Sequence, residues 1–394
     1  MPTQYPPSEA ALLALRSEFP ILEHTTYLIS NSLGAMPREV ESAMHDYTDI
    51  WKTRGVRAWE EKWWMLAAEV GEQIGTLLNA PKGTVSCHQN VTECQAVIAS
   101  CLDFSGKRNK VVYSDLNFPS VMYLWEEQRA LGARVEMVPT DDGIHVPLDR
   151  LLDAIDEETL IVPISHVIFR SSFLQDAKAI VEKAHRVGAL VLLDCFQSLG
   201  CVPVDVHDLG VDFATGGVLK WLCGGPGTAY LYTHPDVAPN LHPRFTGWTA
   251  AENPFGFETG RIRLTNQPYR FMNGTPNVPA LYAAQPGLRI VQQAGVNAIR
   301  AKSKRQVAKI ISVADERGWH VNTPRDPERR GGTVSLDIPN AKDVCAELLR
   351  RDVLVDYRPK CGIRMAPHFY TTDEEIEYAV KVVEQVVEES RVSA

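Results

Sequence analysis

The sequence predicts an α/β protein with a mostly parallel sheet between helices and a smaller α+β domain. Its 394 residues exceed one ordinary domain, and 45% of them are hydrophobic, which is typical of a globular chain. Between about residues 110 and 194, short apolar runs alternate with amphipathic stretches. After about residue 287 the pattern changes to a long helix, one strand and two more helices.

The alternating region contains the elements of a parallel sheet. We expect strands at 110–116, 134–139, 159–165 and 190–194, and helices from Pro119, over 148–156 and over 174–187. Apolar strands that alternate with helices form parallel sheets covered on both faces. Ligands bind such sheets at the carboxyl ends of the strands, so Asp194 is well placed to meet one.

The flanking regions complete three expected parts. Residues 51–78 form an aromatic-rich helical segment, whose tryptophans we expect in the core or in an interface. Near the C-terminus we expect a strand at 333–338, a helix at 342–352 and a closing helix with an apolar stripe formed by Ile376, Val380, Val383 and Val387. We expect an N-terminal segment (1–45) that joins the small domain, a large α/β domain (46–286) and a small C-terminal domain (287–394).

The overall charge and hydropathy exclude several classes of partner. A formal net charge of −9 argues against a surface that neutralises nucleic acid. The sequence has no run of 18 apolar residues, and its N-terminus lacks the pattern of a signal peptide. We therefore expect a cytoplasmic protein that binds neither nucleic acid nor a membrane.

The eight cysteines are scattered and form no C-x-x-C pair, so we expect buried reduced thiols and no metal site. Cys87, Cys94 and Cys101 recur every seven residues and are expected to share one helix face.

Two segments have the residues of an anion site and of a ring-nitrogen partner. Asn90 is a predicted helix cap, and Glu93 completes a capping box. The free N–H groups of such a helix start bind phosphate, and the Thr92 hydroxyl can add a bond, although most capping boxes bind no ligand. Asp194, followed by Gln197, can keep a pyridine nitrogen protonated; the alternative is a helix cap.

Two basic residues complete the candidate chemistry. Lys220 lies between a Gly pair and the Gly-rich stretch 224–227, and a lysine sheltered from solvent can form an imine. The alternative is a surface lysine, which the flanking Trp221 and Leu219 disfavour. Arg364 precedes the final helix and can bind a substrate carboxylate through two N–H groups, or it forms a surface salt bridge.

In their order along the chain, Thr92, Asp194 with Gln197, Lys220 and Arg364 resemble the class V aminotransferase family of fold-type I pyridoxal 5′-phosphate (PLP) enzymes. Within this family the sequence is most similar to kynureninases. That likeness is carried by residues 27–37, 117–120, 220–227, 245–248, 274–281 and 356–370. The resemblance implies the PLP-dependent transferase fold with a seven-stranded, mostly parallel sheet.

The resemblance also implies a role for each matching residue. Lys220 would hold PLP as a Schiff base and move protons at the substrate Cα. Asp194 would pair with the pyridine nitrogen, Gln197 would reach the ring oxygen and Phe118 would stack on the ring. Val91 and Thr92 would bind the phosphate, and in a homodimer Trp248 and Thr275 would complete the phosphate site of the neighbouring subunit. Asn31 and Ser32 would lie near the substrate, and Arg364 would bind the α-carboxylate of the substrate.

Three positions depart from the kynureninase pattern. Gln197, Val121 and Leu219 stand where kynureninases usually have His, Asp and Tyr. The leading hypothesis is kynureninase-like hydrolysis of the Cβ–Cγ bond of an L-α-amino acid with a γ-carbonyl group. The alternatives are a class V aminotransferase, an epimerase, a β-eliminating C–S lyase or a desulfurase with Cys361 as sulfur acceptor. Retention of Lys220 and Asp194 disfavours a binding protein without catalysis.

Overall fold

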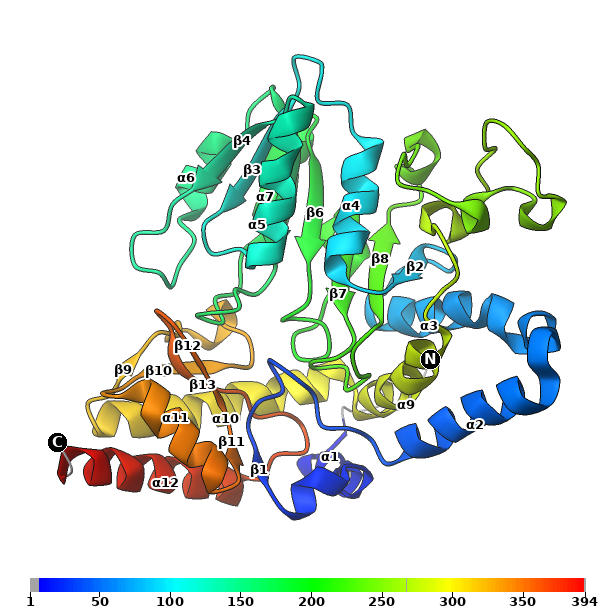
Figure 1. The fold of residues 1–394 in the computed structure, drawn as a ribbon. Helices are drawn as coiled ribbons and strands as arrows, with labels where there is room; N and C mark the ends of the chain where they lie inside the picture. Colours follow the sequence, from blue (N-terminus) through cyan, green and yellow to red (C-terminus); the bar gives the residue numbers. More distant parts are fainter. Residues whose placement is uncertain (1–6, 267, 393–394) are drawn as a thin grey trace.

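A seven-stranded sheet forms the centre of the large domain in the computed structural model, which describes residues 7–266 and 268–392 (Figure 1). Its strands are β2 (Val85–His88), β3 (Lys110–Ser114), β4 (Arg134–Val138), β5 (Thr159–Ser165), β6 (Leu190–Asp194), β7 (Phe213–Gly217) and β8 (Ala229–Thr233). The spatial order is β2-β8-β7-β6-β5-β3-β4. Only β8 runs antiparallel to its neighbours, so the predicted mostly parallel sheet is confirmed.

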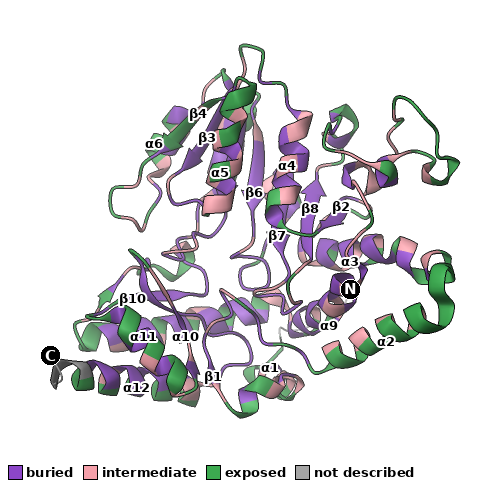
Figure 2. Ribbon diagram, in the orientation of Figure 1, coloured by how far each residue is buried: buried purple, intermediate pink, exposed green. Residues whose placement is uncertain are grey.

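Helices cover this sheet and bury its strands, except for the edge strand β4, in which only Val138 is buried (Figure 2). They are α3 (Trp64–Leu77), α4 (Val91–Cys101), α5 (Pro119–Glu127), α6 (Leu148–Ala154), α7 (Ala177–Arg186) and α8 (Val206–Leu209). The expected helix start at 174 is wrong, because the Asp176 side chain accepts a hydrogen bond from the Ala179 amide and begins α7. Leu174 instead forms a β-bridge with Val167.

The small domain is more strand-rich than the sequence predicts. It contains α10 (Val296–Glu316), β9 (His320–Val321), β10 (Val334–Asp337), α11 (Ala341–Arg350), β11 (Val353–Leu354), β12 (Asp356–Arg358), β13 (Gly362–Met365) and α12 (Asp373–Val392). Four of its strands form an antiparallel sheet in the order β12-β13-β10-β9. The predicted stripe on the closing helix is confirmed, because Ile376, Val380, Val383 and Val387 are all buried.

The N-terminal segment lies against the small domain. It contains α1 (Glu9–Ala14) and β1 (Thr26–Tyr27), and β1 pairs in parallel with β11. The chain then continues through α2 (Glu39–Arg54) to the large domain, where α2 and α3 pack against α9 (Val278–Ala294). Residues 286 and 287, where we place the boundary between the domains, lie inside α9.

The cysteine pattern does not mark one helix face. Cys94 and Cys101 lie on α4, but Cys87 lies on β2, because the chain ends this strand at His88 and begins the helix only after the Asn90 cap. The eight thiols form no disulfide, and seven of them are buried. Within residues 7–266 and 268–392, no group of three or more His, Cys, Asp and Glu side chains is arranged to hold a metal ion.

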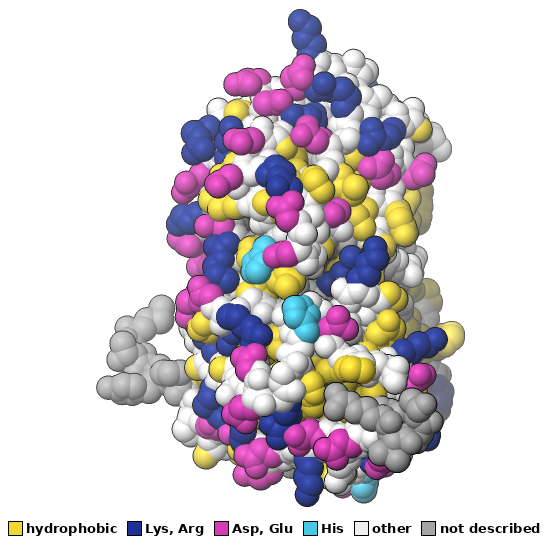
Figure 3. All heavy atoms as spheres, turned by 90° about the vertical axis from the view of Figure 1, so that its left-hand side faces the viewer, with side chains coloured by type: hydrophobic (Ala, Val, Ile, Leu, Met, Phe, Trp, Pro, Cys, Tyr) yellow, Lys and Arg dark blue, Asp and Glu magenta, His cyan; other side chains and the backbone are white. Residues whose placement is uncertain are grey.

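Charges of both signs are mixed on the face of the molecule that Figure 3 shows. On the face in Figure 3, Lys and Arg side chains alternate with Asp and Glu side chains among the residues that the structure describes. Such a mixed surface differs from the basic stripe that binds nucleic acid. None of the described helices combines the length and the apolar character that crossing a membrane requires.

Candidate active site

A cavity of about 220 Å³ opens at the carboxyl ends of β5, β6 and β7. This is the sheet edge at which α/β proteins bind ligands. The side chains that line it come from the start of α4, the start of α5, the ends of β5 and β6, and the loop after β7: Asn90, Val91, Thr92, Phe118, Ser120, Val121, Ser165, Val167, Phe169, Asp194, Phe196, Gln197, Leu219 and Lys220.

Asp194 ends β6 with its carboxylate in the cavity wall. Its Oδ1 accepts a hydrogen bond of 2.9 Å from the Phe196 amide. Burial raises the pKa of Asp194 to about 6, while the Phe196 amide and the positive charge of Lys220 act in the opposite direction. The carboxylate is therefore a desolvated anion, which stabilises a positive charge placed beside it.

Lys220 follows β7 and lines the same cavity as Asp194. Its Nζ lies 4.2 Å from the ring centre of Phe196 and 5.8 Å from that of Phe118. Desolvation lowers the pKa of Lys220 to about 8, although the Asp194 carboxylate opposes this shift. At neutral pH such an amine is unprotonated far more often than a surface lysine, so it can attack a carbonyl carbon.

The N-terminal segment approaches the backbone of Lys220 closely. The Gly34 amide donates to the Leu219 carbonyl at 2.8 Å, and a Cβ on Gly34 would lie 2.2 Å from the Lys220 carbonyl oxygen. Any side chain at Gly34 therefore displaces the segment that carries Lys220.

The start of α4 presents free donors to the cavity. The Asn90 carboxamide accepts a hydrogen bond from the Glu93 amide at 2.9 Å, which confirms the predicted cap. Glu93 accepts from the Gln89 amide rather than from Asn90, so the reciprocal half of the capping box lies one residue earlier than expected. Among the described residues, no group accepts from the Val91 and Thr92 amides.

Aromatic and aliphatic side chains form the walls above these groups. Phe118 caps α5 and is partly exposed, and its ring packs edge-on against Phe169 with the centres 5.1 Å apart. Val121 and Leu219 add aliphatic surface. The walls therefore suit a flat ring and a substrate with an apolar or aromatic side chain.

Gln197 brings a carboxamide to the cavity and bonds to Asn31, which is not a lining residue. The Gln197 Nε2 donates to the Asn31 carbonyl at 2.9 Å. The Asn31 side chain is buried, and neither its Nδ2 nor its Oδ1 has a partner among the described residues. A buried carboxamide without partners is costly unless a ligand satisfies it.

Arg364 is buried and makes two bonds with one carboxylate. Its Nε and Nη2 donate to Asp356 at 2.8 and 2.5 Å, and its Nη1 donates to the Phe169 carbonyl at 2.8 Å. Arg358 also contacts Asp356, at 3.0 Å, so the three side chains carry a net charge of +1. Each terminal nitrogen of Arg364 retains one further N–H.

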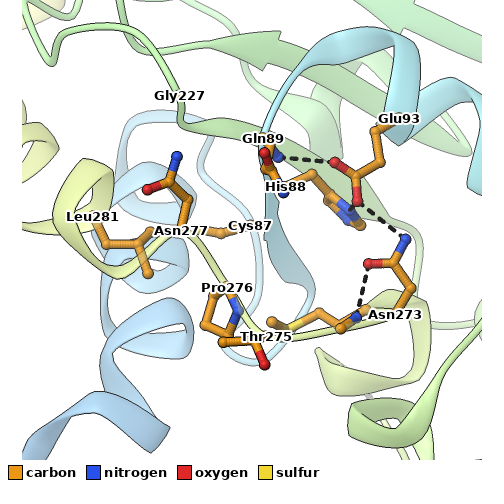
Figure 4. Close-up of a pocket in the computed structure, with 12 residues that line it drawn as sticks. Cys87, His88, Gln89, Glu93, Gly227, Asn273, Thr275, Pro276, Asn277 and Leu281 are labelled. Carbon is orange, nitrogen blue, oxygen red and sulfur yellow. Dashed lines mark hydrogen bonds and ion pairs between the residues drawn. The ribbon is translucent and has the colours of Figure 1, made fainter.

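Five sequence-predicted residues are not among those that line the cavity with Lys220: Asn31, Ser32, Trp248, Thr275 and Arg364. Trp248 packs against Trp64, Phe255 and Phe257 on the surface. Thr275 lines a separate hollow behind the start of α4, together with Glu93 and Asn273 (Figure 4). Ser32 is partly buried near Asn31 and is not among the lining residues.

Several lining residues were absent from the sequence prediction. Ser165 ends β5 next to Asp194 on β6, so the rule that ligands meet strand ends identifies it. Phe169 and Phe196 carry no comparable signal, because the loops that bring them to the cavity are irregular. Asp356, the partner of Arg364, pairs with it across two antiparallel strands that the sequence did not reveal.

The arrangement fits PLP. The sheltered Lys220 amine suits the aldehyde of PLP, and the desolvated Asp194 carboxylate suits its pyridine nitrogen. The free amides at the start of α4 suit its phosphate, and the Phe118 wall suits its aromatic ring. Fold and site together define a fold-type I PLP-dependent enzyme.

The comparisons with known proteins agree. The family model for class V aminotransferases matches residues 26–378. The chain is 32% identical to an uncharacterized aminotransferase, YcbU, of Bacillus subtilis, over 93% of this chain and 95% of that protein, and 29% identical to the kynureninase of Pseudomonas fluorescens, over 97% and 94%. The cysteine desulfurase of Thermococcus onnurineus has a similar fold, with a TM-score of 0.85 at 22% identity, over 98% of this chain and all of that one.

This chain belongs to the class V aminotransferase family, and its cofactor is pyridoxal 5′-phosphate.

Proposed function

We propose that the enzyme hydrolyses the Cβ–Cγ bond of an L-α-amino acid that carries a γ-carbonyl group, as kynureninases do. The observation that carries the proposal is the presence of Lys220 and Asp194 in one apolar-walled cavity, in a chain that is similar to kynureninases along nearly its whole length. PLP supplies an electron-withdrawing ring that makes the substrate Cα acidic.

The roles of the chain's own residues follow from their charges and positions. Lys220, with its lowered pKa, takes the proton from the substrate Cα and returns it later. The Asp194 carboxylate holds a proton on the ring nitrogen, and Gln197 donates to the ring oxygen. Arg364, with the net positive charge that it shares with Arg358, binds the substrate α-carboxylate.

The substrate class follows from the walls. Phe118, Phe169 and Val121 favour an aryl side chain over a charged one. L-kynurenine and its 3-hydroxy derivative are therefore the first substrates to test.

Transamination is the second candidate function, and one feature of the cavity favours it. Val121 and Leu219 are aliphatic, so two wall positions lack a group that could activate water for attack on a γ-carbonyl. Removal of the Cα proton by Lys220 is common to both reactions, and the similarity to YcbU, whose name is that of an aminotransferase, agrees with this candidate.

A desulfurase reaction with Cys361 as sulfur acceptor is disfavoured. The Cys361 thiol is buried, donates to the Arg170 carbonyl at 2.9 Å and does not line the Lys220 cavity. Burial raises the pKa of Cys361, which makes it a poor nucleophile.

A product screen distinguishes the candidates. The PLP-loaded enzyme is incubated with L-kynurenine, 3-hydroxykynurenine and a panel of amino acids, with and without a 2-oxo acid, and the products are identified by mass spectrometry. Alanine together with anthranilate or its hydroxy derivative supports hydrolysis. A 2-oxo acid formed only with an acceptor shows transamination instead, and Lys220→Ala controls for reactions of free PLP.

A further inference from the structure

A chain of hydrogen bonds connects the small domain to the cavity through Trp221. His368 Nε2 donates to the Trp221 carbonyl at 2.9 Å, and the Trp221 indole Nε1 donates to Gln197 Oε1 at 3.2 Å. Gln197 Nε2 then donates to the Asn31 carbonyl at 2.9 Å. All four residues are buried and come from four separate segments of the chain.

The two partners of Gln197 determine which way its carboxamide faces. An indole N–H can only donate, so the atom that it contacts must be the amide oxygen. A backbone carbonyl can only accept, so the atom at Asn31 must be the amide nitrogen. Each contact therefore excludes the orientation of Gln197 in which the amide oxygen and nitrogen are exchanged. The second N–H of Gln197 is then its remaining donor.

Trp221 is itself held from two sides. Its carbonyl bonds to His368, whose ring lies edge-on to the indole with the centres 5.3 Å apart. Burial lowers the pKa of His368 to about 4, so this imidazole is neutral and donates from Nε2 at physiological pH. A Cβ on Gly332 would lie 2.9 Å from the indole ring, so the neighbouring backbone also confines it.

We propose that Trp221 is a positioning residue, which orients Gln197 so that the enzyme presents a fixed hydrogen-bond donor to the ring oxygen of PLP. The inference rests on the assignment of Gln197 to that oxygen under the proposed function. Trp221 does not line the cavity and acts only through Gln197.

The expected signature is the pH dependence of the visible absorption of the PLP-bound protein. A donor to the ring oxygen competes with the proton shared between that oxygen and the lysine nitrogen, so it lowers the pH at which this proton leaves. Loss of the donor raises the midpoint by roughly half to one pH unit, the size of one neutral hydrogen bond. The charged groups that act on Lys220 are Asp194, Arg364, Asp356 and Arg358, and the variants below change none of them.

The test compares Trp221→Phe, Gln197→Leu and the double variant by spectrophotometric pH titration of the PLP-bound proteins. We expect both single variants to raise the midpoint, and we expect Trp221→Phe to add no further shift in the Gln197→Leu background. Trp221→Leu replaces the Phe variant if that variant does not fold. Trp125→Phe is the matched control, because Trp125 is also buried and donates to a buried glutamine, Gln95, at 2.8 Å.

Thermal denaturation shows whether Trp125→Phe and Trp221→Phe lose similar stability, so that only the titration separates them. A midpoint that stays at the wild-type value in Trp221→Phe but shifts in Gln197→Leu overturns the positioning role and leaves the contact of Gln197 intact. No shift in Gln197→Leu overturns both. Equal shifts of the midpoint in the Trp125 and Trp221 variants, or additive shifts in the double variant, show a general effect of lost packing. Either result also overturns the positioning role of Trp221.

Discussion

Lys220 and Asp194 follow neighbouring parallel strands, and this adjacency determines their chemistry. Asp194 ends β6, Lys220 lies three residues after the end of β7, and the two strands pair directly. Each group shifts the pKa of the other toward its charged form, while desolvation acts against both charges. Desolvation exceeds the attraction of the carboxylate, so the pKa of the Lys220 amine falls.

The lowered pKa of Lys220 predicts how the apoprotein takes up PLP. The unprotonated amine is the attacking form, so the uptake rate should rise about tenfold per pH unit below about pH 8 and level off above it. Because Asp194 raises the pKa of Lys220, Asp194→Asn should move this break to lower pH. Stopped-flow absorbance measures the rate. The same measurement with N-acetyl-lysine amide gives the pH dependence of the reaction of PLP with an unperturbed lysine side chain. A break near pH 10.5 contradicts the prediction.

Asp194→Asn should retain PLP but lose turnover by about 10²-fold or more, because a neutral amide cannot hold a proton on the ring nitrogen. Asp212→Asn is the matched control. Asp212 is also buried and accepts from the Val191 amide at 2.7 Å, but it lies at the opposite end of the sheet's strands, away from the cavity. Steady-state kinetics and bound PLP are measured for both variants, and wild-type turnover in Asp194→Asn identifies Asp194 as a structural residue only.

At the scale of the element, the start of α4 combines a helix cap with backbone amides that have no acceptor among the described residues. Asn90 satisfies the Glu93 amide, and Glu93 in turn accepts from the Gln89 amide and from Asn273 Nδ2 at 3.0 Å (Figure 4). His88, the Gln89 amide and Asn273 lower the pKa of Glu93 to about 2, so it stays charged throughout the physiological range. This network fixes the start of α4, where we propose that the Val91 and Thr92 amides bind the phosphate of PLP.

Asn90→Ala should therefore lower both stability and PLP affinity. Loss of a cap costs about 1 kcal/mol of stability. Asp176→Ala removes the equivalent cap of α7, where the side chain accepts from the Ala179 amide at 3.1 Å, and it should cost similar stability while PLP affinity stays unchanged. Denaturant unfolding and fluorescence titration with PLP separate the two effects. Equal PLP affinity in both variants argues against a phosphate site at α4.

At the scale of the whole molecule, the exposed aromatic surface predicts a second subunit. Trp248, Phe255 and Phe257 are 40%, 57% and 73% exposed; the first two pack against Trp64, and Phe257 stacks on Trp248. Next to this cluster lies a hollow of about 520 Å³, lined by Val56, Arg57, Trp59, Glu60, Trp64, Met65 and Phe255. Contiguous apolar surface of this kind marks protein interfaces. We propose that a homodimer covers it and brings Trp248 and Thr275 to the partner's phosphate.

Phe257→Arg should weaken this dimer, because it introduces a charge into an apolar contact. The variant should dissociate at higher protein concentration than the wild type and lose PLP on dilution, since the site needs both subunits. Tyr123→Arg is the control, because Tyr123 is similarly exposed, at 69%, but lies on α5. Analytical ultracentrifugation and absorbance at matched concentrations measure both properties. A variant monomer that retains PLP contradicts shared active sites.

The sequence by itself determined the features that depend on local pattern. The period of the apolar residues predicted the strands β3 to β6, and α4 begins at the Asn90 cap because an N-cap acts within one helical turn. The flanking glycines indicated Lys220, and the end of an apolar run indicated Asp194; both patterns can be read directly from the sequence. The short strands β9, β12 and β13 were missed because two to four residues are too few to show a period.

Only the tertiary structure decided which of these residues meet. The pairing of Arg364 with Asp356 depends on the register of β12 and β13, and the contact of Trp221 with Gln197 joins the loops after two neighbouring strands. Burial by distant segments, rather than adjacent sequence, lowers the pKa of Lys220 and raises that of Asp194. Desolvation depends on every group packed around an atom, so the sequence predicted which residues are candidates for the chemistry, while the fold determined the pKa values of their side chains.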